Sequence, residues 1–118
     1  MNKYQPDKFV VIKITNKEGK THHRVFGTWA GGYTTGDSWR LNSGVDWVEA
    51  KGPLLIFHGS SGSVYEVHKD MYGYTSWTGS VLEGWKNDYD NGRGPKLEIL
   101  PNQDWTQFDF KGGNKDGQ

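Results

Sequence analysis

The sequence predicts a β-rich α+β fold: an antiparallel sheet of short strands and hairpins with one amphipathic helix packed on it. Three observations indicate this fold. The 118 residues include 17 glycines, and so many glycines indicate frequent tight turns. Short apolar segments bounded by turn residues recur along the chain, which is typical of strands. A single segment has the apolar spacing of an amphipathic helix.

Aromatic residues make up 14% of the chain, including six tryptophans, whereas hydrophobic residues reach only 33% in total. Large rings must therefore supply much of the core. The length is that of one domain. We expect residues 1–100 to form this domain and residues 101–118 to be a polar C-terminal tail, mobile at its end. The rings through which part of the tail can dock are Trp105, Phe108 and Phe110.

Residues 8–29 have the pattern of a β-hairpin, with alternating apolar residues in the first half. Gly19 can adopt the left-handed conformation that a bulged hairpin turn requires. The predicted register places Thr15 opposite Lys20. The face that this register buries consists of Val10, Ile12, Ile14 and Val25.

The middle of the chain contains further predicted strands, over residues 38–41, 45–50, 54–58 and 63–68. Residues 54–58 are apolar on both faces, so this strand should lie inside a sheet rather than at its edge. The loop Gly59–Gly62 joins the last two strands into a second hairpin. The pairs predicted in this hairpin are Leu54 with Val67, Ile56 with Tyr65, and His58 beside Ser63.

Residues 75–87 are the predicted helix, and Thr75 or Ser76 can cap its N-terminus. Apolar residues recur there at intervals of four, which predicts one face packed on the sheet. The residues of that face are Trp77, Val81, Leu82 and Trp85. A last strand is expected over residues 96–100.

Charge and cysteine content restrict the partners. Fourteen basic and 14 acidic residues cancel, which does not favour a duplex nucleic acid as partner. The chain has no cysteine, which excludes a disulfide framework and a thiolate metal site and fits a reducing compartment. Polar residues follow Met1, so we expect no signal peptide, no membrane partner and a cytoplasmic location.

The sequence indicates neither a metal site nor a catalytic site. His22 and His23 are neighbours on a predicted strand and should point to opposite faces. Residues 88–92 begin like a calcium loop, but Gly92 stands where the third oxygen ligand is needed. The carboxylates form no pair suited to acid–base chemistry. We therefore expect no metal, no cofactor and no catalytic residue.

The segment 33–40 is the first candidate binding site. It is a Gly-containing loop that carries Tyr33, Asp37, Trp39 and Arg40. An aromatic ring there can stack on a planar ligand while the guanidinium pairs with an anion. In the alternative interpretation, Trp39 belongs to the core and Arg40 is its solvent-facing neighbour.

The loop after residue 58 is the second candidate. Successive backbone N–H groups and three hydroxyls beside His58 can form a small nest for phosphate or another anion. The hydroxyls are those of Ser60, Ser61 and Ser63. The alternative is a flexible hairpin turn. A nucleophile elbow is not matched, because Ser63 stands where glycine is required.

Three stretches together resemble small phage-encoded accessory proteins: residues 28–33, residues 36–44 and residues 59–65. The resemblance covers about the middle third of the chain. It implies a compact accessory protein that inhibits a host factor or sequesters a host molecule, in the host cytoplasm. It transfers no catalytic residue.

Two functions from different classes follow. In the first, a non-catalytic protein captures a small anionic or nucleotide-like ligand through the two candidate segments. In the second, the protein inhibits a host protein through an aromatic surface or an exposed strand edge, since Trp, Tyr and Arg dominate interface energies. An enzyme of unknown chemistry is the third alternative, and homo-oligomer formation stays open.

Overall fold

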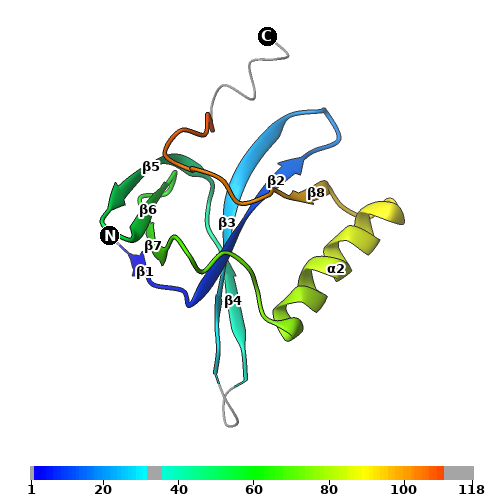
Figure 1. Ribbon diagram of the computed structural model, residues 1–118. Coiled ribbons are helices and arrows are strands. Elements are labelled where there is room, and N and C mark those ends of the chain that lie inside the picture. Colours follow the sequence, from blue (N-terminus) through cyan, green and yellow to red (C-terminus); the bar gives the residue numbers. More distant parts are fainter. Residues whose placement is uncertain (1, 32–35, 111–118) are drawn as a thin grey trace.

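The computed structural model describes residues 2–31 and 36–110 and confirms the β-rich α+β fold, with strands in two four-stranded sheets (Figure 1). The first sheet contains, in spatial order, β1 (Lys3–Tyr4), β7 (Val64–His68), β6 (Leu54–Gly59) and β5 (Val45–Lys51). The second contains β4 (Ser38–Leu41), β3 (Thr21–Trp29), β2 (Lys8–Thr15) and β8 (Lys96–Ile99). The helix is α2 (Ser76–Asp90). Strand pairs are antiparallel except β1 with β7.

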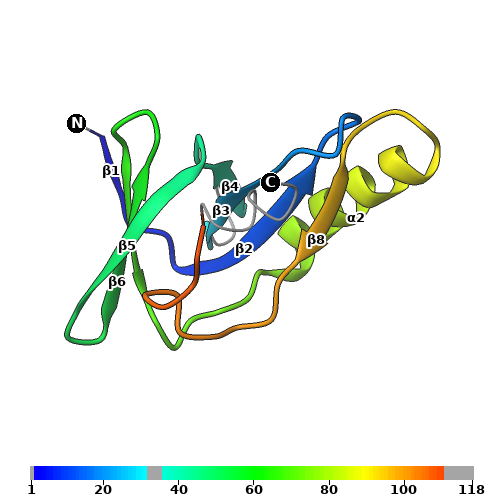
Figure 2. The same cartoon turned by 90° about the horizontal axis from the view of Figure 1, so that it is seen from above.

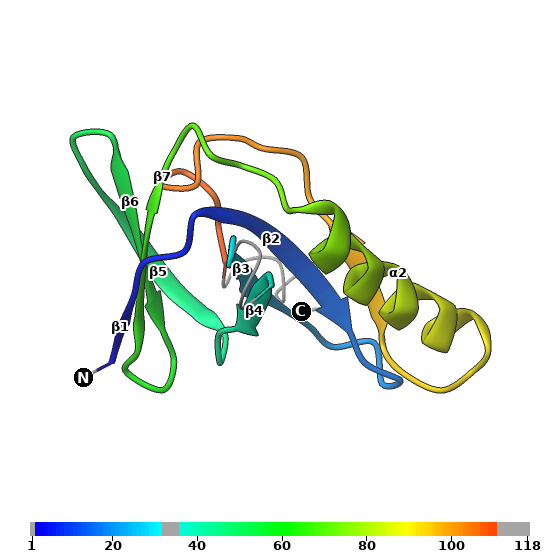
Figure 3. The ribbon, with the colours of Figure 1, turned by 90° about the horizontal axis from the view of Figure 1, so that it is seen from below.

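The second sheet is the middle layer, with the first sheet on one side and α2 on the other, as the views from above and below show (Figures 2 and 3). Strand β2 therefore has two buried faces. Phe9 and Val11 pack into the core shared with the first sheet. The alternate residues pack into the core shared with α2, and they are Val10, Ile12 and Ile14. Each core depends on this one strand.

The backbone of β2 finds partners beyond β8, which pairs only with its second half. Phe9 N donates to Met71 O at 3.2 Å, and Gly73 N donates to Phe9 O at 2.8 Å. Between them, the Tyr72 hydroxyl accepts from Val11 N at 3.0 Å and donates to a carbonyl at 2.6 Å, that of Leu100. Burial raises the pKa of Tyr72 to about 12, so this hydroxyl stays protonated as a donor.

The predicted register of the first hairpin is wrong by one residue. Thr15 pairs with Thr21, not Lys20, because Asn16 N donates to Lys20 O and the Asn16 side chain accepts two further backbone N–H groups. Gly19 has φ +85°, as expected for the turn. The shift moves Val25 to the opposite face, opposite Val11, so the predicted face that included Val25 is incorrect.

The second hairpin is also shifted by one residue. Gly59 N donates to Ser63 O at 2.8 Å, which pairs His58 with Val64. The pairs predicted for Leu54 and Ile56 are therefore wrong; the inward-facing pairs are Leu55 with Val67 and Phe57 with Tyr65. The prediction that this segment is an interior strand is confirmed, since β6 lies between β7 and β5.

Helix α2 begins as predicted and ends three residues later than predicted. Thr75 is the N-cap and forms a reciprocal capping box with Thr78. Thr78 and Leu82 are the buried residues of the helix, with Val81 and Trp85 half-buried beside them. Trp77 is 56% exposed, so the prediction that it packs on the sheet is wrong. The buried stripe starts one residue later, at the threonine of the capping box.

Within residues 2–31 and 36–110, no helix has the length and apolar character needed to cross a bilayer.

The segment after β8 packs against the first sheet through its rings. Trp105 is only 1% exposed, and its indole Nε1 donates to Asn102 Oδ1 at 3.1 Å. Phe108 and Phe110 lie edge-on to the His23 ring, with centroid distances of 5.0 and 5.6 Å. Residues 101–110 thus complete the core. The rest of the predicted tail, residues 111–118, lies outside the described residues.

Two tryptophan variants test this assignment of the core. Trp105→Ala should lower the free energy of unfolding by about 3–5 kcal/mol, because it opens a large cavity. Trp77→Ala is the matched control and should change it by no more than about 0.5 kcal/mol. Urea unfolding followed by circular dichroism measures both. Equal losses in the two variants would contradict the packing described for these rings.

Candidate functional site

A polar cleft of about 230 Å³ lies where the β3–β4 end of the second sheet meets the first sheet. The second sheet and the turn after β4 contribute Arg24, Arg40, Leu41, Asn42 and Ser43. The first sheet and its loops contribute Asn2, Tyr4, Ser61, Ser63 and Tyr65. The cleft therefore brings together Arg40 with Ser61 and Ser63, three residues that the sequence placed in two separate candidate segments.

Arg40 is held by aromatic neighbours from the first sheet. Its guanidinium carbon lies 4.5 Å from the ring centroid of Tyr4, a cation–π contact. The strand pairing places Arg40 opposite Gly27, and a side chain at Gly27 would come within 2.7 Å of Pro6. Gly27 thus lets the first sheet approach β3 closely. Burial raises the pKa of Tyr65, and the positive charge of Arg40 opposes this rise.

Asn42 forms the floor of the cleft by continuing the β3 pairing past the end of β4. Its side-chain Oδ1 accepts from Val25 N at 2.8 Å, and its own N donates to Val25 O at 3.0 Å. The side chain is buried. Its loss would leave a buried N–H without an acceptor. Asn42 and Tyr4 are site residues that sequence reasoning missed.

The serine loop is tied to the turn after β4 rather than left as a free hairpin turn. Ser61 N donates to Ser43 Oγ at 3.0 Å, and the Ser43 hydroxyl donates to Ser61 Oγ at 3.0 Å. Ser60 Oγ also lies 3.2 Å from Ser43 Oγ, and Ser61 Oγ lies 3.4 Å from Ser63 Oγ. Four hydroxyls therefore form one connected chain, and three of them belong to residues that line the cleft, Ser43, Ser61 and Ser63.

The expected nest of free backbone N–H groups is not formed. The N–H groups of Gly59, Ser60, Ser61 and Gly62 each donate to an acceptor within the protein. An anion in the cleft would have to use the guanidinium groups and hydroxyls instead. The acceptors are the carbonyl oxygens of Ser63, Gly44 and Gly59 and the Ser43 hydroxyl. These bonds occupy the amides on which a nest depends.

The cleft carries positive charge without a counter-charge. None of the described residues that line it is acidic. Within the described chain, neither Arg24 nor Arg40 has a carboxylate partner. Arg24 Nε donates to His22 Nε2 at 3.1 Å, which fixes the guanidinium and leaves its terminal N–H groups for a ligand. Such groups bind oxyanions in pairs of charge-assisted hydrogen bonds.

Trp39 does not join Arg40 in the cleft. Neighbours on a strand point to opposite faces, and Trp39 faces α2, where it stacks on Phe26 at 5.5 Å between ring centroids and meets Trp85 at 5.1 Å. In the alternative interpretation Trp39 belongs to the core and Arg40 faces solvent. Arg40 is exposed, but Trp39 is 38% exposed and lies at the margin of the packing, outside both core clusters. Asp37 Oδ1 accepts from Gly31 N at 3.4 Å, away from the cleft lining. Tyr33 lies outside the described residues.

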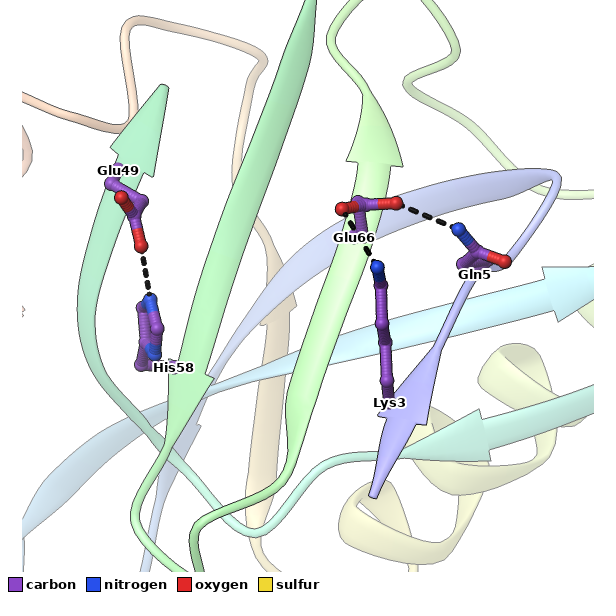
Figure 4. A network of polar contacts seen from close by, with 5 residues as sticks. All are labelled: Lys3, Gln5, Glu49, His58 and Glu66. Atoms are coloured by element: carbon purple, nitrogen blue, oxygen red, sulfur yellow. Dashed lines mark hydrogen bonds and ion pairs between the residues drawn. The ribbon is translucent and has the colours of Figure 1, made fainter. Parts of the chain in front are cut away.

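His58 lies on the outer face of the first sheet, not beside the serine loop, because of the register shift. Its ring stacks on Trp47 with a centroid distance of 3.9 Å, and its Nε2 lies 2.7 Å from Glu49 Oε2 (Figure 4). A second polar group on this face joins Glu66 to Lys3 and Gln5 (Figure 4). Among the described residues, no three His, Asp or Glu side chains are grouped as metal ligands.

A second cavity, an apolar groove of about 390 Å³, lies between α2 and the second sheet. Its apolar lining consists of Ile14, Leu41, Trp85, Pro95 and Leu97. Its polar lining consists of Asn16, His22, Arg24, Asp88 and Arg93. Arg24 and Leu41 line both the groove and the polar cleft.

No protein-family model, curated protein or solved structure matches this chain.

The two neighbouring histidines face opposite sides of the second sheet, as predicted, with His22 opposite Ile14 and His23 opposite Lys13. Burial lowers the pKa of His22, and the charge of Arg24 lowers it further. Burial also lowers the pKa of His23, with a further contribution from Lys13. The folded protein therefore favours the neutral form of both imidazoles.

Lowering the pH should destabilise the protein through these histidines. Each folded-state pKa lies below the unfolded value of about 6.5, so the stability is fully present above that pH and is lost as pH falls through the folded-state pKa. We expect the urea midpoint to drop between about pH 7.5 and about pH 5. The double variant His22→Gln, His23→Gln should drop less, with both proteins compared at about pH 8 to remove the cost of the substitutions. The same drop in both proteins would assign the pH dependence to other groups.

Proposed function

We propose that this protein is a non-catalytic binding protein that captures a small anionic or nucleotide-like ligand in the polar cleft. In a phage-type accessory factor, such capture would sequester a host molecule in the host cytoplasm. The observation that carries the proposal is the meeting of Arg24 and Arg40 with the hydroxyls of Ser61 and Ser63. Neither arginine has a carboxylate partner among the residues that the structure describes.

The chemistry of the lining supports an oxyanion as ligand. A guanidinium presents N–H groups in a planar fork that matches two oxygens of a phosphate. The contact with Tyr4 restrains Arg40, and the hydrogen bond to His22 restrains Arg24, so less side-chain freedom is lost on binding. Serine hydroxyls can rotate to donate to the remaining oxygens.

The same lining supports capture rather than turnover. The described residues around the cleft are arginine, asparagine, serine, tyrosine and leucine. The hydroxyls of Ser61 and Ser63 hydrogen-bond to other hydroxyls, and no histidine or carboxylate lies in the lining to activate them. These groups suit binding and orientation of an anion.

Arg40 variants test the proposal, with pyrophosphate as the probe in calorimetric titrations. Arg40→Lys keeps the charge but loses the fork, and should weaken binding about tenfold, because a hydrogen bond to a charged group contributes about 1.5–3 kcal/mol. Ser61→Asp should also weaken binding, through repulsion of the probe. Thermal melts of each variant check folding.

Arg93→Gln is the matched control, because Arg93 is an exposed arginine that pairs with Asp88 outside the polar cleft. It should leave the affinity for pyrophosphate unchanged. Unchanged affinity in both Arg40→Lys and Ser61→Asp, with intact folding, would remove these residues from the site. A loss of the same size in Arg93→Gln would indicate non-specific attraction to positive charge.

A second candidate function, inhibition of a partner protein, is favoured by one observation. Strand β5 is an edge strand of the first sheet, and its Trp47 is 52% exposed on the outer face. An exposed edge beside an aromatic anchor suits strand addition or a protein interface. A partner held there would be lost on Trp47→Ala and kept on Arg40→Lys, the reverse of the pattern for capture in the cleft.

A further inference from the structure

We infer that the ligand is amphipathic, with a phosphate in the polar cleft and a planar, uncharged ring, such as a nucleobase, in the apolar groove beneath α2. This inference rests on the proposed function and adds the groove as the second half of one continuous site. It identifies the ligand class as phosphate monoesters of ring compounds, the class to which nucleoside monophosphates belong.

The two cavities join at Arg24 and Leu41, which line both. The topology explains why. Strand β4 ends at Leu41, whereas β3 continues past it, so at Arg24 β3 pairs with β2 on one side and has no strand on the side of β4. Arg24 can therefore reach round the edge of the sheet, from the face that packs on α2 towards the cleft. A molecule bound to this guanidinium can extend in both directions.

The charges of the groove are placed for a ligand with one anionic end. Arg93 is already paired with Asp88, with 3.3 Å between its Nη2 and the carboxylate Oδ1. Among the described residues, Arg24 pairs with His22, whose neutral form is favoured, and with no carboxylate, so its charge is left uncompensated where the groove meets the cleft. The remainder of the groove offers Ile14 and Trp85 to an uncharged group.

Size and donor number favour a ring phosphate over a simple anion or a carboxylate. The cleft alone, about 230 Å³, is smaller than a usual small-molecule site of about 300–1,000 Å³, whereas the groove, about 390 Å³, falls within that range. Two guanidinium groups and a row of hydroxyls offer more donors than a carboxylate can accept. A tetrahedral phosphate uses them better.

Gly94 offers a way to fill the groove without disturbing the cleft. It lines the groove, and a Cβ added there would lie 3.8 Å from Asp88 Cβ, an ordinary contact. Gly94→Leu should therefore fold and obstruct the ring subsite. Gly84→Leu is the matched control, because Gly84 has open space around it on α2 and does not line the groove.

The experiment measures the affinities of inorganic phosphate, adenosine monophosphate, adenosine and phenylacetate by calorimetry. The unmodified protein should bind adenosine monophosphate at least about tenfold more tightly than phosphate, equivalent to about 1.4 kcal/mol. Gly94→Leu should remove this advantage and leave the affinity for phosphate unchanged. Gly84→Leu should keep both affinities.

Equal binding of phosphate and adenosine monophosphate by the unmodified protein would overturn the inference and leave the proposed function standing. Retention of the advantage in Gly94→Leu would also overturn it, as would tighter binding of phenylacetate than of adenosine monophosphate. Absence of any phosphate binding would contradict the proposed function itself, and the inference would fail with it.

Discussion

The structure depends on one strand, β2, which is buried on both faces. Residues 9–12 of this strand are fully buried, so each of their backbone groups needs a partner within the protein. Strand β8 pairs with the second half of β2, and residues 71–73 and the amide of Leu100, which donates to Val11 O, serve the first half. Tyr72 is central to this arrangement, because its single hydroxyl joins Val11 to Leu100. The first sheet covers one face of β2 and the helix covers the other, because apolar side chains point to both faces.

The candidate site lies where this layered packing ends. At the edge of the second sheet, β4 stops at Leu41, and the cleft is lined by residues of both sheets beside this point. Asn42 takes the place of the missing strand by forming two hydrogen bonds with Val25. The backbone N–H and C=O of Val25 are therefore paired, although β4 does not extend along this part of the edge. Arg24, which is half-buried, and Arg40, which is exposed, can therefore both reach a ligand. The buried core thus supports a positively charged edge.

The sequence predicted most of the strands and the helix cap, and it indicated Arg40 and the serine loop as binding segments. Both hairpin registers were predicted wrongly, because each is set by a hydrogen bond that the alternation of apolar residues does not reveal. In the first hairpin the Asn16 side chain accepts from Lys20 N, and in the second Gly59 N donates to Ser63 O. One residue of shift was enough to move Val25 to the opposite face and to pair His58 with Val64 instead of Ser63. The meeting of Arg40 with the serine loop depends on how two sheets pack, which local sequence does not encode.

Anomalous scattering from crystals grown with tungstate, a heavy analogue of phosphate, tests most directly whether the cleft is an anion site. The account predicts an anomalous peak in the cleft, within hydrogen-bond distance of the guanidinium groups of Arg24 and Arg40 and of the Ser61 or Ser63 hydroxyl. Crystals of Arg40→Lys should show a weaker peak at that position under the same conditions. Ordered crystals that hold tungstate only elsewhere on the surface, with the cleft open to solvent, would contradict the account.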